Sequence, residues 1–442
     1  MVDSFFHLRE KQTSTRIEIV AGLTTFLTMA YIIFSQPNIL GSTGMDKDAL
    51  IAVTCIVSAI ATIITGIFAN APIAMAPGMG LNAIFAYLVV SGKMDWQTAL
   101  GAVFLSGVFF LVLTLLGLRK KIVEAIPASL ISAIAVGIGL FITFMGLADL
   151  GIVVSNEVTI VSAGPITSTV LIGLAGLLVM IYLEAKKIKG SLLVGILAGT
   201  VLAAVFGKIK IPEQFISFDV DISPIALKLD VIGALKWSFF GSIFTLMFVD
   251  MFDSIGTLVA CCGQAGMVDE NNKIKGLDRL LSIDALATMV GALFGSSTTT
   301  SYAESAAGIE QGGRTGLTSI VTGLLFLLAL LFIPIVRIVP KYATAPALIM
   351  VGLFMMKEVK KINFTDVEEA FPAFIIMVMI ALSYSISAGL AFGFLSFVVI
   401  KTVCGKIREV KPTMWLIALL SIGFLTHDRL SELINRLINS AG

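Results

Sequence analysis

Two stretches of this sequence place carboxylates inside long apolar runs, where an ionised side chain is expensive and is usually functional. Glu304 lies in the stretch 296–313, among small and hydroxyl residues between two apolar runs. Asp250 and Asp253 lie three residues apart in another run, so they share one helix face. Because two such carboxylates cannot both stay charged in a dry site, they are candidates to carry a proton.

Two other side chains could complete a binding site around these acids. Asn82 follows PGMGL, and its amide can donate and accept at once, as the edge of a heteroaromatic base requires. Tyr302 could stack on a planar ligand or use its hydroxyl. The alternatives are an interhelical hydrogen bond for Asn82 and simple packing for Tyr302.

Four further acids near predicted span ends are expected to have only snorkelling or helix-dipole roles: Asp149, Glu184, Asp284 and Glu310.

Several classes of function are excluded by the residues that are missing from the apolar runs. No Lys or Arg falls at the middle of a predicted span, so acceptors dominate and a cation or a neutral, donor-rich solute is favoured. The two histidines, His7 and His427, lie near the chain ends, which argues against a catalytic triad or a His-rich metal site. We therefore expect no enzyme, no metal and no cofactor. A net charge of +1 without a basic stripe gives no sign of nucleic-acid binding.

The elements that must position these residues are membrane helices. Of the 442 residues, 57% are hydrophobic and only 13% are charged, which is typical of a polytopic membrane protein in contact with lipid. Met414–Thr426 is a further, short apolar run that we interpret as re-entrant or interfacial. Fourteen full or partial spans are predicted, near 17–36, 50–69, 74–91, 97–118, 125–147, 167–184, 190–206, 233–261, 281–295, 298–312, 315–335, 343–357, 372–386 and 388–404.

The distribution of Lys and Arg supports this count and orients the chain. With a cytoplasmic N-terminus, the inner segments carry 20 of these residues and the outer segments carry 8. The long 148–166 segment has none. The inner set includes Arg119, Lys120, Lys121, Lys273 and Lys275.

The longest outer connection, within 207–232, divides the spans seven and seven. Because seven is odd, the second half enters the membrane with the opposite orientation, which is the arrangement of an inverted-repeat transporter. The spans 74–91 and 298–312 are both rich in small residues and interrupted, and we expect short extended pieces in them. Such a matched pair indicates a site near the midplane, although Gly and Pro in the first could also serve packing alone.

Three motifs make the chain resemble a known family. APGMGLNAIFAY, FVDMFDSIGT and TTTSYAESAAGIEQGGRTGL are similar to motifs of the AzgA-like purine permeases, among the nucleobase-cation symporters related to uracil and xanthine permeases. The resemblance runs over essentially the whole chain. It implies an all-α fold with fourteen spans in seven-plus-seven inverted repeats, divided into a core and a gate domain. The implied parts are a cytoplasmic segment 1–16, core halves 17–118 and 233–335, gate halves 119–206 and 336–411, an extracellular linker 207–232, and a C-terminal segment and tail 412–442.

The same resemblance implies a proton symporter that imports adenine, guanine or hypoxanthine through the cytoplasmic membrane as the core moves past the gate. Matched by position, the polar site comprises Asn82, Asp250, Asp253 and Glu304, with Tyr302 beside the base. We expect Asp250 and Glu304 to carry the coupling, and Asp253 to be a second candidate. A homodimer through the gate domain is a further expectation. The alternatives are a uracil- or xanthine-type permease, and a channel or receptor that uses the same carboxylates.

Overall fold

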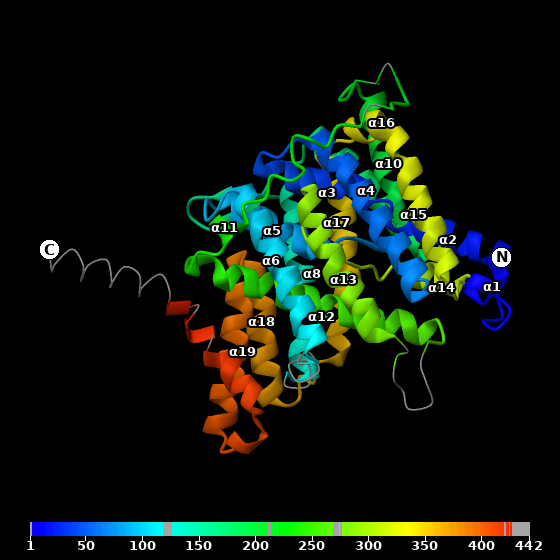
Figure 1. Cartoon of the computed structure of the whole chain (residues 1–442). Helices are drawn as coiled ribbons and strands as arrows, with labels where there is room; N and C mark the ends of the chain where they lie inside the picture. The colour runs from blue at the N-terminus through cyan, green and yellow to red at the C-terminus, as the bar shows by residue number, and fades with distance from the viewer. Residues whose placement is uncertain are drawn as a thin grey trace.

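The structure of this chain is a computed structural model, and it is built almost entirely from helices (Figure 1). The predicted basic positions Arg119, Lys120, Lys121, Lys273 and Lys275, and the tail 427–442, lie outside the described residues. The structure describes residues 2–117, 126–210, 212, 214–218, 220–267, 274, 276–419, 421–423 and 425–426.

Eight helical stretches in the described ranges are long and apolar enough to cross a membrane, so this is a multi-pass membrane protein. They are Thr15–Thr43, Lys47–Ala69, Trp96–Leu115, Ala128–Leu150, Ser168–Ala185, Phe240–Gln264, Gly316–Arg337 and Lys341–Lys361. Shorter apolar helices include Met79–Val90, Ser191–Val205 and Ala388–Val403.

Side-chain and glycine caps define where several of the helices begin and end. Asp95 accepts a hydrogen bond from Thr98 N at 2.7 Å and begins α6 (Trp96–Leu115). Gly151 adopts φ 83° and ends α8 (Ala128–Leu150), a left-handed position that suits glycine. The other long helices are α4 (Lys47–Ile64), α9 (Ser168–Ala185), α10 (Ser191–Val205), α12 (Phe240–Gln264), α13 (Leu277–Phe294), α15 (Gly316–Ala329), α17 (Lys341–Met355), α18 (Val367–Ser383) and α19 (Ile386–Val403).

The first predicted span, 17–36, is not one continuous helix. It consists of α2 (Thr15–Met29) and α3 (Ile32–Leu40), and between them Ile33 N and Phe34 N bond three residues back instead of four. Pro37 lies inside α3 and cannot donate to the carbonyl of residue 33, which favours a change of helix geometry just before it. Tyr31 lies at this break, directly before α3, and is buried.

The expected extended pieces are present in both interrupted segments. Strand β1 (Met75–Pro77) precedes α5 (Met79–Val90), and strand β4 (Thr299–Ser301) precedes the short α14 (Ser305–Glu310). The two strands pair antiparallel, with Met75 opposite Ser301 and Pro77 opposite Thr299, and both are buried. Their pairing satisfies backbone groups that would otherwise be unpaired inside the membrane, and it joins segments that lie far apart in the sequence.

The helices pack in two groups. In one, α15 packs against α2 and α4, α13 packs against α6, and α14 packs against α2; in the other, α8 packs against α17 and α18, and α9 packs against α10 and α17. Figure 1 shows α2, α14 and α15 together on the N-terminal side of the molecule and α18 and α19 on the opposite side. Contacts between the groups include α3 with α17, α5 with α8, and α12 with α19.

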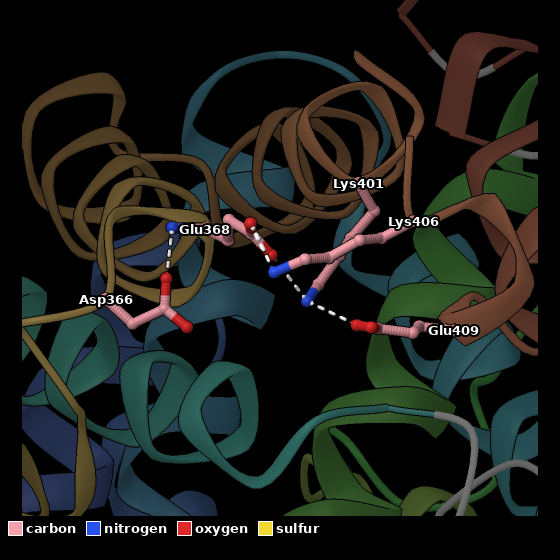
Figure 2. Close-up of polar contacts among 5 residues, drawn as sticks. All are labelled: Asp366, Glu368, Lys401, Lys406 and Glu409. Atoms are coloured by element: carbon pink, nitrogen blue, oxygen red, sulfur yellow. Dashed lines mark hydrogen bonds and ion pairs between the residues drawn. The ribbon is translucent and has the colours of Figure 1, made fainter. Parts of the chain in front are cut away.

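A charged cluster ties the ends of α18 and α19 together. The ammonium of Lys401 lies 2.8 Å from Glu368 and 2.8 Å from Glu409, and Lys406 lies 2.7 Å from the other oxygen of Glu368. Asp366 caps α18 by accepting from the Glu368 amide at 2.9 Å. Figure 2 shows both ammonium groups between the two glutamates, so the cluster closes the α18–α19 hairpin at one end.

The remaining short elements lie at the ends of these helices. Strands β2 (Val153–Asn156) and β3 (Ile160–Ala163) form an exposed hairpin after α8. The predicted span 233–261 begins later, because the chain first forms α11 (Val231–Ala234), which Asp230 caps. The others are α1 (Val2–Phe6), η1 (Gly41–Thr43), η2 (Thr65–Ala69), η3 (Trp237–Phe239), η4 (Leu330–Phe332), α16 (Ile333–Arg337), η5 (Met356–Lys361) and η6 (Ile407–Glu409).

Candidate functional site

Asp250 lies on α12 beside strand β4 and is almost completely buried. One of its carboxylate oxygens accepts a hydrogen bond from Thr288 Oγ1 at 3.1 Å. The same Thr288 hydroxyl lies 2.9 Å from the carbonyl of Thr299 in β4. The other oxygen, Oδ1, is buried without a hydrogen-bond partner among the described residues. A buried acceptor in this condition loses its hydration without replacement and therefore marks a place where a ligand or a proton can bind.

Asn82 approaches the same segment from the first turn of α5. Its side-chain oxygen accepts a short hydrogen bond from Ser297 Oγ, and its backbone N–H bonds to Gly78 O at 2.8 Å. The Nδ2 donor is buried and has no partner in the described part of the chain. Asn82 therefore offers an unused donor where Asp250 offers an unused acceptor.

Glu304 stands at the start of α14, directly after β4, and is half-buried. Tyr31 Oη donates to its carboxylate at 2.8 Å. The helix that follows crosses α2 closely, since a Cβ at Gly308 would lie 2.5 Å from the carbonyl of Ala21. Glycine at this crossing lets α14 seat against α2, and this seating brings Glu304 to Tyr31.

Asp253 lies one turn after Asp250 on α12, but its side chain is exposed. It is close enough to Glu304 for the two charges to interact. The same face of α12 continues through Gly256 and Gly263, where an added Cβ would have nothing within 4 Å. The structure therefore places Asp253 at the open edge of the site and Asp250 inside it.

Tyr302 uses its hydroxyl within the protein. Tyr302 Oη donates to the carbonyl of Pro77 at 2.6 Å, and the ring is buried. This bond ties the end of β4 to the end of β1. The hydroxyl thus braces the strand pair, and the ring remains the part of Tyr302 that could lie beside a ligand.

Asp284 was expected to lie near a helix end without a site role. The structure instead places it among the buried polar residues around the segment 297–304, which we call the polar centre. It is fully buried on α13 and accepts hydrogen bonds from Ser301 N at 2.9 Å, Ser301 Oγ at 3.0 Å and Ser254 Oγ at 2.5 Å. The predicted span began at residue 281, whereas α13 begins at Leu277, so Asp284 lies two turns inside the helix. A predicted span that began at residue 277 would have placed Asp284 inside the helix.

Glu18 is a second buried acid that the sequence did not single out. Its carboxylate accepts from Arg314 N at 2.9 Å, Thr318 N at 3.2 Å and Thr318 Oγ1 at 2.5 Å, all at the start of α15. A carboxylate at a helix N-terminus satisfies unpaired N–H groups and complements the helix dipole. Glu18 therefore fixes the chain just after α14 and takes no part in the polar centre.

Four carboxylates thus gather around the segment 297–304, without a basic partner. None of the ion pairs between described residues includes one of these four, and the described residues contain no arrangement of acids suited to a metal ion. Carboxylates in this setting can accept N–H groups of a neutral solute or bind protons. The four are Asp250, Asp253, Asp284 and Glu304.

Comparison with known proteins was made over the whole chain. A model of the permease family of xanthine and uracil permeases matches residues 16–414. The adenine permease AdeP of Escherichia coli is 41% identical over 96% of this chain and 95% of its own length. The guanine/hypoxanthine permease PbuO of Bacillus subtilis is 40% identical over 94% of this chain and 98% of its own length.

Among solved structures, the transmembrane domain of the cyanobacterial bicarbonate transporter BicA is similar in fold. The TM-score is 0.65 at 17% sequence identity, and the match covers 84% of this chain and 96% of that one. At this identity the likeness concerns the fold alone. The resemblance to AzgA-like purine permeases is confirmed by the family match and by the named relatives.

Proposed function

Because this chain belongs to the permease family of xanthine and uracil permeases, we propose that it carries purine nucleobases across the cell membrane together with protons. The relatives named as adenine and guanine/hypoxanthine permeases support a purine as the substrate. The observation that carries the proposal is the pair of unused buried groups, Asn82 Nδ2 and Asp250 Oδ1, beside the paired strands. A purine edge presents the matching acceptor and donor.

In this proposal each candidate residue has a distinct task. Glu304 accepts ring or exocyclic N–H groups of the base, and Asn82 binds another edge. The ring of Tyr302 lies beside the base. Asp250 carries the coupling proton, and Asp253 is the second candidate at the open edge. No cofactor is needed, since the coupling ion is the proton.

The proposed movement is the sliding of a core against a gate. The core comprises 17–118 and 233–335, and the gate comprises 119–206 and 336–411. Together they form fourteen spans in two inverted repeats. The remaining parts are a cytoplasmic segment 1–16, an extracellular linker 207–232 and a C-terminal segment 412–442. The two packing groups of helices support this division. Protonation and purine binding together remove unpaired charge from the core, so the fully loaded core crosses with the smallest desolvation cost.

Two rival functions remain to be separated by experiment. A uracil- or xanthine-type permease would use the same fold, and labelled hypoxanthine competed by unlabelled bases distinguishes it from a purine carrier. A channel or a receptor would show no accumulation in response to an imposed proton gradient. In proteoliposomes with an acidic exterior, the proposed symporter should concentrate hypoxanthine inside. The proposal also places the N-terminus in the cytoplasm and allows a homodimer through the gate.

Substitutions of the two central acids test the residue roles. Glu304→Gln should abolish purine binding, because the acceptor that faces the N–H groups becomes half donor. Asp250→Asn should leave some binding but stop proton-driven accumulation. Binding is measured by calorimetry on purified protein and accumulation by uptake into proteoliposomes. Glu310→Gln, at the exposed end of the same short helix as Glu304, is the matched control and should bind as the parent does. Normal binding by Glu304→Gln would contradict its assignment.

A further inference from the structure

Two buried hydroxyl groups lead from Asp284 on α13 toward Asp250 on α12. Ser254 Oγ donates to Asp284 Oδ2 at 2.5 Å and lies 2.7 Å from Thr300 Oγ1. The Thr300 side chain in turn lies near enough to Asp250 to act on its carboxylate. All four side chains are buried, so the path from one carboxylate to the other excludes bulk water.

The donors along this path can all point the same way. If Asp250 is protonated and its O–H turns to Thr300, the Thr300 hydroxyl can donate to Ser254, and Ser254 donates to Asp284. If each proton moves one step, the Asp250 O–H bond breaks, each hydroxyl gives one proton and takes another, and a new O–H bond forms on Asp284. The hydroxyls are unchanged at the end, and one proton has moved between two carboxylates.

Apart from the hydrogen bonds that Asp284 accepts, no group of opposite charge among the described residues acts on it. The ionisable groups that act on it or on Asp250 are the two acids themselves and Asp253, and Asp253 also interacts with Glu304. Of the elements packed against α13, α6, η2 and β4 carry no ionisable side chain. Helix α4 carries only Lys47, Asp48 and the buried Cys55, and the two charged residues stand at its first turn. Because no cation among the described residues acts on Asp250 or Asp284, a shared proton can neutralise this pair.

Holding strand β4 in place does not require both carboxylate oxygens of Asp284. Asp284 Oδ1 already holds β4 through Ser301 N and Ser301 Oγ. The second oxygen, Oδ2, accepts from Ser254 Oγ. Ser254 Oγ is also hydrogen-bonded to Thr300 Oγ1, which lies toward Asp250. The carboxylate therefore has one oxygen for position and one oxygen at the end of a path for protons.

We propose that Asp284 is a second holding site for the coupling proton, exchanged with Asp250 through Thr300 and Ser254. This inference rests on the proposed symport. It lets the proton leave the substrate-facing acid without crossing the purine. Ser254 and Thr300 act as relay residues that touch neither the purine nor the membrane surface.

The test separates proton movement from purine handling. Ser254→Ala and Thr300→Val each remove one hydroxyl of the path. Thr300→Ser keeps the hydroxyl and is the matched control. Asp284→Asn keeps the size of the side chain but cannot carry the proton. Each variant is measured for hypoxanthine binding, for exchange of labelled against unlabelled hypoxanthine at equal pH, and for accumulation under an inward proton gradient. With one coupled proton, a gradient of one pH unit supports accumulation of about tenfold.

We expect Ser254→Ala, Thr300→Val and Asp284→Asn to bind and exchange hypoxanthine but to lose most of this accumulation, while Thr300→Ser retains it. Accumulation equal to that of the parent in all three would overturn the relay and leave the proposed symport intact. Equal loss of binding, exchange and accumulation in Asp284→Asn and Ser254→Ala would show that they only hold β4. A parent protein that binds and exchanges hypoxanthine without accumulating it would refute the proton coupling itself.

Discussion

Tyr31 and Glu304 meet at the site although 273 residues separate them in the sequence. The phenol hydroxyl donates to one oxygen of the carboxylate. A hydrogen bond of this kind limits the rotation of the carboxylate, so, if Glu304 accepts from a base as proposed, this acceptor is oriented before the base binds.

We predict that Tyr31→Phe weakens hypoxanthine binding without abolishing it. The lost hydrogen bond involves a charged acceptor, so the effect should be about 1.5–3 kcal/mol, or roughly tenfold to a hundredfold in Kd. Calorimetric titration of purified protein measures it. Tyr182→Phe removes the hydroxyl of an exposed tyrosine on α9 and should leave Kd unchanged. If the two variants bind alike, the Tyr31 hydroxyl has no part in positioning Glu304.

At this scale the sequence identified acids by their apolar surroundings, and the structure buries Asp250 and half-buries Glu304. It failed for Asp284, because the position of a residue along a helix depends on a boundary that hydropathy defines only within a few residues. It also missed Tyr31, since nothing in an apolar run shows which aromatic ring will face a carboxylate from a distant segment. Long-range contacts of this kind depend on the packing of helices and not on local patterns.

Among the elements, the α18–α19 hairpin is the one closed by a network of charges. Lys401 is largely buried and contacts two glutamates, and Glu368 contacts two lysines. Donation to Glu368 raises the pKa of Lys406, which lies in the loop after α19. The contribution of Lys406 to stability is therefore complete below the ordinary pKa of lysine and is lost only as the pH rises through the higher value in the folded protein.

We predict that Glu368→Gln lowers the thermal unfolding temperature by several degrees at pH 7, because it leaves the buried ammonium of Lys401 with a single, more exposed partner. Lys401→Met should be milder. The methionine fills the same buried path, and Glu368 still pairs with Lys406. Thermal unfolding of purified protein in detergent compares the two. A larger loss in Lys401→Met than in Glu368→Gln would contradict this account of the cluster.

Helix bounds were predicted to within one residue for some capped helices and less closely for others, since α18, which Asp366 caps, begins at Val367 against a predicted 372. The structure has α9 at Ser168–Ala185, against a predicted 167–184, because Thr167 caps its first turn. The division of the first span could not be read in the same way. Its apolar pattern is continuous, and the change of hydrogen bonding before Pro37 serves the burial of Tyr31.

At the scale of the whole molecule, two ion pairs join residues of the two proposed domains: Arg337 with Asp48, and Lys189 with Glu310. Lys189, in the connection between α9 and α10, forms a short contact with Glu310 at the end of α14. Both side chains are partly exposed, so the pair stabilises this arrangement by only about 0.2–1 kcal/mol. If the core slides against the gate as proposed, this contact must break in each cycle.

We predict that Lys189→Glu changes the rate of hypoxanthine exchange by up to roughly fivefold while leaving Kd unaltered, since about 1 kcal/mol corresponds to that factor. The double exchange of charge, Lys189→Glu with Glu310→Lys, should restore the parent rate. Radiolabel exchange in proteoliposomes provides the measurement, at low and at high salt because screening reduces the effect. Failure of the double variant to recover would show that the two side chains are not coupled.

The pairing of β1 with β4 also sets an order of events during biosynthesis. When residues 75–77 enter the membrane, their partners at 299–301 have not yet been translated. The backbone groups of the first strand therefore stay unpaired with β4 until more than two hundred further residues have been made. Asn82 and the acids therefore come together only in one late step of assembly. If the site binds a purine as proposed, a nascent chain cannot hold the purine before both halves are inserted.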